Sequence, residues 1–249
     1  MPGMTRAATA RPQEDALLGR PRQAAFLTAA VVAVTAVVFV LVADHGTLAR
    51  IQRLDDAWLR LMISGRAPAL TAIAKVFNVL GLVYVTLPVR IALAGFLAVR
   101  RRWWHLAAFA AAIVLSEVLI GSLKGIYDRA RPPGSLVATT NASFPSGHAI
   151  AASVTVVAAV IALVPAGRRR VLWGAAAVAF SIVMGLSRAY LGAHWLSDAT
   201  AGILLGTSCA LVTALVADQF QRRQNRLQRA AGTQCLAGVP PAHRAEDRR

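Results

Sequence analysis

The sequence has few of the residues that soluble proteins use on their surfaces or in covalent frameworks. Only 15% of its 249 residues are charged, whereas an average soluble domain has about 25%. Two cysteines, Cys209 in an apolar segment and Cys235 in a polar one, exclude a disulfide framework and a cysteine-based zinc site. Lysine is almost absent, with only Lys75 and Lys124, so arginine supplies the net charge of +16. These shortages argue against a soluble globule and against a disulfide-stabilised domain.

Apolar residues dominate instead. They make up 57% of the chain, and the mean hydropathy is +0.56. They gather in six runs, at residues 24–43, 76–98, 103–123, 149–166, 171–187 and 195–217. A helix that spans a bilayer needs about 20 such residues, a length that the fourth and fifth runs only just reach. We therefore predict an all-α, polytopic membrane protein with six transmembrane helices.

The segments around these runs indicate the domain organisation. Residues 1–23 form a predicted cytosolic tail, residues 24–217 a six-span domain, and residues 218–249 a basic cytosolic tail that we expect to be disordered. Between the first two runs, apolar residues recur at helical spacing, at Leu48, Ile51, Leu54, Trp58, Leu61 and Met62. This pattern predicts an amphipathic helix that lies on the outer membrane surface.

Arginine is distributed unevenly between the loops. With the N-terminus inside, the cytosolic segments contain the clusters 100–102 and 168–170 and the arginines of both tails, whereas the opposite loops contain fewer. The positive-inside rule therefore places both termini in the cytosol of a multi-pass plasma (inner) membrane protein. Because the arginines form short clusters between apolar runs, the charge reflects topology and not a nucleic-acid partner.

Three short polar segments interrupt the apolar pattern, at residues 124–132, 144–148 and 187–198. Counted from a cytosolic N-terminus, the third and fifth spans end at the outer face, and the fourth and sixth begin there. The three segments are therefore expected to meet at the extracytoplasmic face, although they lie far apart in the sequence. This result depends only on the parity of the spans.

The first part of the predicted site is a cradle for an anion. Lys124, Arg131 and Arg188 bring three cations together, and the arginine fork matches the geometry of phosphate oxygens. Ser146 resembles a helix N-cap followed by the flexible Gly147, and such a helix start offers backbone N–H groups to an anion. Each feature has an ordinary structural explanation when taken alone, but their meeting at one face favours phosphate binding.

The second part is a pair of histidines. His194 and Asp198 are four residues apart at a helix start, so the carboxylate is expected to orient the imidazole as in a nucleophile or base dyad. His148 supplies a second imidazole that can protonate a leaving oxygen. Together with the cradle, these groups describe phosphoryl transfer that needs no metal or other cofactor.

The combined pattern Lys-x6-Arg-Pro, Pro-Ser-Gly-His and Ser-Arg-x5-His-x3-Asp resembles the type 2 phosphatidic-acid phosphatase family, the membrane branch of the lipid phosphatase and vanadium haloperoxidase superfamily. The matching residues are Lys124, Arg131, Pro132, Pro145, Ser146, Gly147, His148, Ser187, Arg188, His194 and Asp198. The resemblance implies that His194 attacks phosphorus, Asp198 orients it and His148 protonates the leaving group. It also implies that Lys124, Arg131, Arg188 and the Ser146–Gly147 turn hold the phosphate oxygens.

The resemblance implies an integral membrane lipid phosphatase that works through a phosphohistidine intermediate. Because the predicted site faces outward, where undecaprenyl diphosphate is released after cell-wall assembly, we favour a polyprenyl diphosphate substrate. The alternative is phosphatidate or phosphatidylglycerol phosphate. A non-catalytic lipid-binding or transport protein on the same scaffold is disfavoured, because binding alone needs no oriented nucleophile. The sequence leaves the oligomeric state open.

Three charged residues outside these motifs also need an interpretation. Arg90 and Glu117 lie inside apolar runs, where unpaired charges are costly. Their estimated levels in the membrane differ by roughly 9 Å, so we favour Arg90 extending to the cytosolic interface and Glu117 supporting Lys124 over a direct ion pair. Arg129 lies in a loop, where an arginine is usually a solvated charge.

Overall fold

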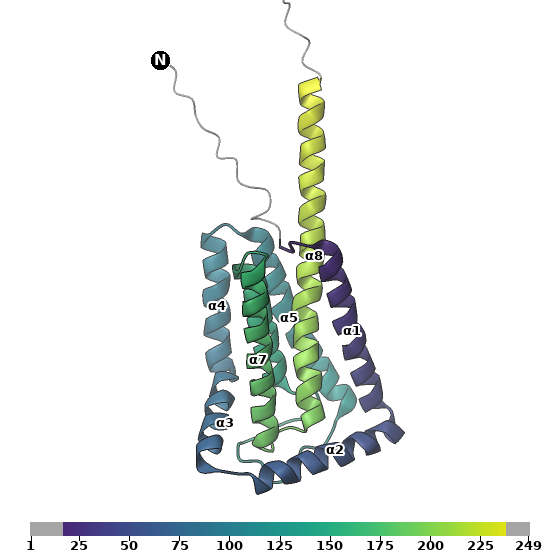
Figure 1. The fold of residues 1–249 in the computed structure, drawn as a ribbon, viewed down its shortest axis with the longest axis vertical. Helices are drawn as coiled ribbons and strands as arrows, with labels where there is room; N and C mark the ends of the chain where they lie inside the picture. Colours follow the sequence, from purple (N-terminus) through teal and green to yellow (C-terminus); the bar gives the residue numbers. More distant parts are fainter. Residues whose placement is uncertain (1–16, 238–249) are drawn as a thin grey trace, which may run out of the picture.

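A computed structural model describes the backbone of residues 17–237 and the side chains of residues 17–231. Within this range the chain forms eight α-helices and no β-strand, which confirms the predicted all-α class (Figure 1). The helices are α1 (Pro21–Ala43), α2 (His45–Ser64), α3 (Pro68–Leu80), α4 (Val83–Val99), α5 (Trp103–Tyr127), α6 (Gly147–Leu163), α7 (Arg168–Tyr190) and α8 (Leu196–Ala237).

The helices differ in whether they are long and apolar enough to cross a membrane. Four of those in the described range meet both conditions, namely α1, α5, α7 and α8. The pair α3 and α4 forms a fifth candidate span if the two are counted together, and α6 is an apolar helix of 17 residues. The structure thus has four or five candidate spans by length and composition, so the predicted count of six is not established.

The apolar run 76–98, predicted as one straight span, is divided in two. α3 already begins at Pro68, and a break at Gly81 and Leu82 bends the path by 52° before α4 starts. Gly81 lies directly against the ring of His148, because a β-carbon added to Gly81 would come within 2.3 Å of the His148 Cδ2 atom. Hydropathy cannot reveal this break, since both halves are equally apolar.

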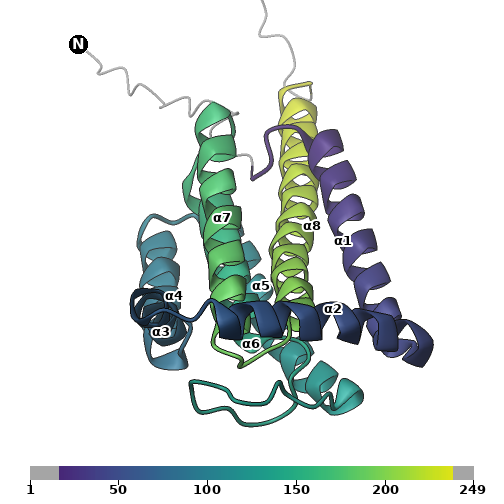
Figure 2. The ribbon, with the colours of Figure 1, turned by 60° about the horizontal axis from the view of Figure 1, so that its bottom comes forward.

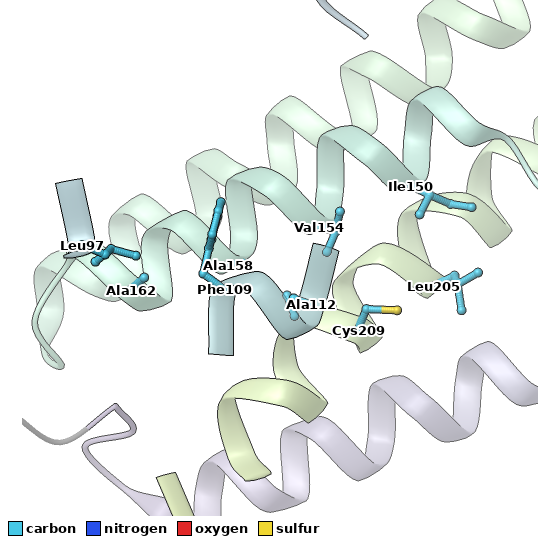
Figure 3. Packing of buried hydrophobic residues seen from close by; sticks show 10 residues of the cluster. Leu97, Phe109, Ala112, Ile150, Val154, Ala158, Ala162, Leu205 and Cys209 are labelled. Carbon is cyan, nitrogen blue, oxygen red and sulfur yellow. The ribbon is translucent and has the colours of Figure 1, made fainter. Parts of the chain in front are cut away.

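α6 is the central helix and packs against α5, α7 and α8. Its side chains Ile150, Val154, Ala158 and Ala162 form a buried cluster with residues of α5 and α8 (Figure 3). Small residues bring the helices close, since a β-carbon on Gly206 of α8 would lie 2.1 Å from Oγ of a serine on α6. Because α6 is surrounded by protein, its short length does not have to match the full hydrocarbon thickness.

The predicted amphipathic helix is present as α2. It lies across the ends of α7 and α8 and contacts both (Figure 2). The Asp44 carboxylate caps its N-terminus by accepting from the Thr47 backbone N–H at 2.8 Å. Its buried residues include the acid Asp55, which is 2% exposed. α2 therefore packs onto the bundle with a charged group on its inner face.

At the opposite end of the bundle, α8 continues far beyond residue 217 (Figure 1). Residues 218–237, assigned in the sequence analysis to a disordered tail, are helical, while residues 238–249 lie outside the described range. Asp218 is 1% exposed and accepts from the Leu18 backbone N–H at 3.1 Å and from Arg222 Nε at 2.6 Å. The boundary expected at residue 217 thus falls inside a helix that packs against the segment before α1.

Arg90 and Glu117 form a direct ion pair, contrary to the arrangement favoured from the sequence. Arg90 Nη1 lies 2.7 Å from Glu117 Oε1, and Arg90 Nε donates to Thr155 Oγ1 at 2.9 Å. The prediction was wrong because a difference in level along the helix axes does not exclude contact between two long side chains on neighbouring helices. α6 also supplies an additional acceptor, Thr155 Oγ1.

Candidate active site

The three polar segments meet at one end of the bundle, the end that α2 crosses (Figure 2). The loop between α5 and α6 joins the turn between α7 and α8 through the Leu136 N–H, which donates to the Leu191 carbonyl at 2.9 Å. The Ser146 N–H at the start of α6 donates to the backbone carbonyl of Asp198 at 3.1 Å. The structure therefore brings together the three polar segments, as predicted from the order of the spans.

His194 lies at the centre of this cluster and is 4% exposed. Its Nδ1 is 2.8 Å from the backbone carbonyl of Ser143. A carbonyl oxygen can only accept, so Nδ1 carries the proton and the lone pair of the neutral ring lies on Nε2. Arg131 Nη1 is 3.3 Å from this Nε2. The unprotonated nitrogen of His194 thus lies beside a guanidinium group that can bind an anion.

Burial lowers the pKa of His194 to about 4, because it penalises the charged imidazolium. The Asp198 carboxylate opposes this effect, while the Arg131 and Arg188 guanidinium groups add to it. The imidazole is therefore neutral at physiological pH, which is the form that a nucleophile requires.

Asp198 is fully buried and does not hold His194 by the direct hydrogen bond that the sequence spacing suggests. Its Oδ2 lies 3.8 Å from His194 Nδ1, too far for a hydrogen bond. Oδ2 accepts instead from Ser143 Oγ at 2.5 Å and from the Trp195 N–H at 3.0 Å. Ser143 thus connects Asp198 to His194, because its hydroxyl contacts the carboxylate and its carbonyl contacts the ring.

Arg129 is buried, so its interpretation as a solvated charge was wrong. Arg129 is 8% exposed, and its Nη1 lies 2.6 Å from Asp198 Oδ1. Its Nη2 lies 2.8 Å from Asp55 Oδ2 on α2 and donates to Gln52 Oε1 at 2.7 Å. Asp55 also accepts from the Ser197 hydroxyl at 2.5 Å. Arg129 therefore bridges the amphipathic helix to the carboxylate beside His194.

A signal for this bridge was present in the sequence. Asp55 lies four residues after Ile51 and seven after Leu48, so it falls within the apolar stripe of the amphipathic helix. An acid in that position must be buried and paired with a cation when the stripe packs onto protein. Helical spacing could thus have identified Asp55, although it could not have named Arg129 as the partner.

Two of the predicted phosphate-binding cations organise the loop between α5 and α6. Lys124 Nζ donates to the Ala142 carbonyl at 2.8 Å. Arg131 donates to the carbonyls of Ala193 at 2.6 Å, Thr140 at 2.7 Å and Asn141 at 2.9 Å. These bonds curve the loop around the guanidinium group and keep its positive charge next to His194.

Three other predicted residues carry buried polar side-chain atoms that have no hydrogen-bond partner among the described residues. These atoms are Ser146 Oγ, His148 Nε2 and Arg188 Nε. Ser146 occupies the N-cap position of α6, as predicted, but its side chain makes no capping bond. His148 has Arg188, His194 and Arg131 as electrostatic neighbours. A polar ligand that contacts these atoms would remove the cost of leaving them unpaired.

Asn78, at the end of α3, is a site neighbour that the sequence analysis did not identify. Its side-chain oxygen accepts a hydrogen bond from Arg188 Nη1. Gly81, three residues later, contacts the His148 ring. The break between α3 and α4 thus touches both a predicted phosphate-binding arginine and the second histidine. No motif carries this information, because α3 reaches the site only through the fold.

The chemistry of the site follows from its charges. Within the described residues there is no group of three or more histidine, cysteine or acidic side chains placed to hold a metal ion. The groups that surround His194 are cationic or neutral donors, with the negative charge of Asp198 already paired to Arg129. The arrangement can therefore bind a tetrahedral oxyanion next to an unprotonated imidazole nitrogen.

Comparisons with known proteins agree with this geometry. Residues 103–222 match the model of the PAP2 superfamily. The fold is similar to a transmembrane PAP2-type phosphatidylglycerolphosphate phosphatase from Bacillus subtilis, with a TM-score of 0.61 and 23% identity over 79% of this chain and 96% of that one. It is also similar to Aquifex aeolicus LpxE, with a TM-score of 0.52 and 27% identity over 62% of this chain and 91% of that one. No curated protein matches the chain significantly in sequence.

The fold and the family match define a membrane phosphatase of the PAP2 type. Residues 103–222, which contain all three motifs, match the PAP2 superfamily. The predicted family and the predicted enzyme class, a phosphoric ester hydrolase, are thereby confirmed. The matched segment covers α5 to α8, whereas α2 and α3, which contribute Asp55 and Asn78, lie outside it.

Proposed function

We propose that the protein is an integral membrane lipid phosphatase that uses His194 as its nucleophile. His194 Nε2 forms a bond to the terminal phosphorus while the bond from that phosphorus to the leaving oxygen breaks, and the leaving oxygen takes a proton from His148. The leaving oxygen is the bridging oxygen of a diphosphate or the ester oxygen of a monophosphate. A water molecule then hydrolyses the phosphohistidine and releases inorganic phosphate. The observation that carries this proposal is the neutral, buried imidazole with Nδ1–H bonded to Ser143 O and Nε2 beside Arg131.

In this mechanism the cations stabilise the charge that develops on the phosphoryl oxygens. Lys124, Arg131 and Arg188 bind these oxygens, together with the backbone N–H groups at Ser146 and Gly147. The buried Arg188 Nε and Ser146 Oγ, which have no protein partner in the described region, support this role. Positive charge from side chains replaces a metal ion, so turnover should continue in the presence of chelators.

The substrate follows from the proposed topology. We infer six spans, with α3 and α4 as one bent span and α6 as a short one, both termini in the cytosol, and the site at the extracytoplasmic face of the plasma membrane. A polyprenyl diphosphate such as undecaprenyl diphosphate is the favoured lipid at that face. Phosphatidylglycerol phosphate and phosphatidate are the alternatives. A common assay with all of these lipids discriminates between them.

The experiment measures phosphate release from the three lipid classes by the purified protein in detergent micelles with a chelator present. The wild-type protein is expected to release phosphate, most rapidly from the polyprenyl diphosphate, and vanadate is expected to inhibit it. His194→Ala should be inactive on every substrate, because no phosphohistidine can form. His148→Ala should lose the rate acceleration of about 10²–10⁴-fold that general acid catalysis supplies on a lipid substrate. On a nitrophenyl phosphate, whose leaving group needs no proton, the same variant should lose much less. An active His194→Ala protein, or strict dependence on a divalent metal, would refute the proposal.

A further inference from the structure

A second cationic feature lies beside the site, where the connection from α2 reaches α3. A pocket of about 430 Å³ opens there, and two of its lining residues, Arg66 and Lys75, are positively charged. The wall also contains the Thr71 hydroxyl and the apolar side chains of Pro68 and Leu136. None of these residues belongs to the three motifs, so the pocket is not part of the cradle around His194.

The pocket is built onto the active-site turn by several contacts. Arg66 Nη2 donates to the Gly134 carbonyl at 3.3 Å, in the loop between α5 and α6. The Tyr190 hydroxyl at the end of α7 accepts from the Ala67 N–H at 3.1 Å and lies 3.0 Å from Thr71 Oγ1. Tyr190 is four residues before His194 in the chain. The pocket and the nucleophile are thus attached to the same short connection.

The pocket also lies next to the phosphate-binding arginine through α3. Lys75 and Asn78 are three residues apart on this helix, which corresponds to an axial rise of about 4.5 Å. The Asn78 side chain accepts from Arg188. An anion at Lys75 would therefore lie roughly one helical turn away from the residues that contact Arg188.

Arg66 provides a second indication that the pocket receives a polar group. Its Nε is buried and has no hydrogen-bond partner within the described part of the chain. Lys75 is exposed, so its ammonium group is available at the mouth of the pocket. A buried guanidinium N–H without a partner is costly, and an anion is the group best suited to accept from it.

The outer surface of α3 indicates what kind of molecule carries that anion. Leu70 and Ile73 are 52% and 54% exposed, and they belong to a helix that contributes to a candidate span. Acyl or prenyl chains can therefore lie along α3 while the headgroup enters the pocket. Lipid diphosphates and phosphatidylglycerol phosphate both have a second phosphate between the terminal phosphoryl group and the chains.

From this juxtaposition we propose that Arg66 and Lys75 form a subsite for the second phosphate of a lipid headgroup, next to the site where the terminal phosphoryl group is transferred. The proposal rests on the proposed function and narrows its substrate class. It favours lipids with two phosphate groups, joined by an oxygen bridge or by glycerol, over lipids with one.

The test uses two substrate pairs in which one member has a second phosphate; in the first pair this is the only difference, and in the second pair it comes with a glycerol unit. Farnesyl diphosphate is compared with farnesyl phosphate, and phosphatidylglycerol phosphate with phosphatidate. Lys75→Gln should raise KM about tenfold for the lipid of each pair that has two phosphates, because one charge-assisted contact is lost. For the lipid with one phosphate, KM should change less than about twofold. Arg66→Gln should do the same, and it is the second variant because its contact with Gly134 also supports the loop. Arg60→Gln, which removes an exposed charge from α2, is the matched control.

The outcomes are distinct. A selective effect on the diphosphate alone, on phosphatidylglycerol phosphate alone or on both supports the subsite and identifies the spacing that it accepts. Equal effects within every pair, or no effect of either variant, would overturn it. If the wild-type protein hydrolyses none of the four lipids, the proposed function has failed.

A binding measurement tests the subsite independently of the proposed phosphatase activity. Farnesyl methylenediphosphonate and farnesyl phosphonate are titrated into His194→Ala protein by calorimetry, with and without Lys75→Gln. The subsite requires that Lys75→Gln weaken binding of the diphosphonate about tenfold and leave the monophosphonate unchanged. An unchanged ratio of the two Kd values would reject the subsite whatever the activity of the protein.

Discussion

Two buried arginines, Arg129 and Arg90, show how similar ion pairs can differ in meaning. Arg129 connects α2 with α8, Arg90 connects α4 with α5, and each lies 2.6–2.8 Å from a carboxylate oxygen. Arg129 holds two carboxylates whose side chains are 2% and 0% exposed, and one of them is Asp198. The partner of Arg90, Glu117, has a side chain that is 53% exposed.

The difference lies in what each pair touches. Arg129 shares Asp198 with Ser143, and Ser143 in turn contacts His194, so a change at Arg129 reaches the reacting nitrogen. Arg90 contacts Glu117, Thr155 and the Ala151 carbonyl, none of which belongs to the site. The first arginine is therefore expected to affect catalysis, and the second mainly stability.

The largest effect is expected from Arg129→Gln. This change leaves Asp55 and Asp198 as buried, unpaired carboxylates, so kcat should fall by about 100-fold or more. Arg129→Lys should recover part of the loss, because it restores the charge without the two-pronged geometry. The measurement is kcat on a lipid phosphate, with Arg53→Gln on the exposed face of α2 as control. A normal kcat for the glutamine variant would contradict the positioning role.

A smaller effect is expected from Asp55→Asn. The amide can still accept from Arg129, but the charge that anchors the guanidinium group is lost. We expect kcat to fall about tenfold, a cost of about 1.4 kcal/mol, with little change in KM, because Asp55 acts through Asp198 and not on the substrate. Arg53→Gln, on the exposed face of the same helix, is again the control. A change confined to KM would show that α2 contributes to substrate binding instead.

The Arg90 pair should show the opposite behaviour. Arg90→Leu and Glu117→Gln are each expected to lower the free energy of unfolding by about 1–3 kcal/mol, with kcat within about twofold of wild type. The double variant should recover part of the lost stability, since neither charge is then left alone. Thermal unfolding in micelles measures this coupling. A loss of activity without a loss of stability would place the pair in the catalytic machinery.

The smallest effect concerns pH. Because burial lowers the pKa of His194 to about 4, the ring should remain neutral as the pH falls from 8 to 5. It should protonate only near pH 4, and not near the ordinary value of about 6.5. The ¹⁵N shifts of the His194 ring, identified by their absence in His194→Ala, report this titration. A midpoint near 6.5 would indicate that the groups around the ring stabilise its charged form enough to offset the cost of burial.

Much of the site was predictable because each motif is local. Ser146, Gly147 and His148 are adjacent, and His194 and Asp198 are one helical turn apart, so the spacing alone places each set on one surface. Parity of the spans then predicts that the sets meet. Spacing could not show whether Asp198 bonds to His194 directly, because it does not reveal that Ser143 lies between them.

The sequence by itself determined the helical class, the amphipathic helix and the residues of the family pattern, since these depend on hydrophobic periodicity and short-range spacing. Only the tertiary structure decided the partners: Asp55 for Arg129, Glu117 for Arg90 and Asn78 for Arg188. The physical reason is that periodicity reports which face of a helix is buried, whereas the neighbour that the face meets depends on how the helices cross and bend.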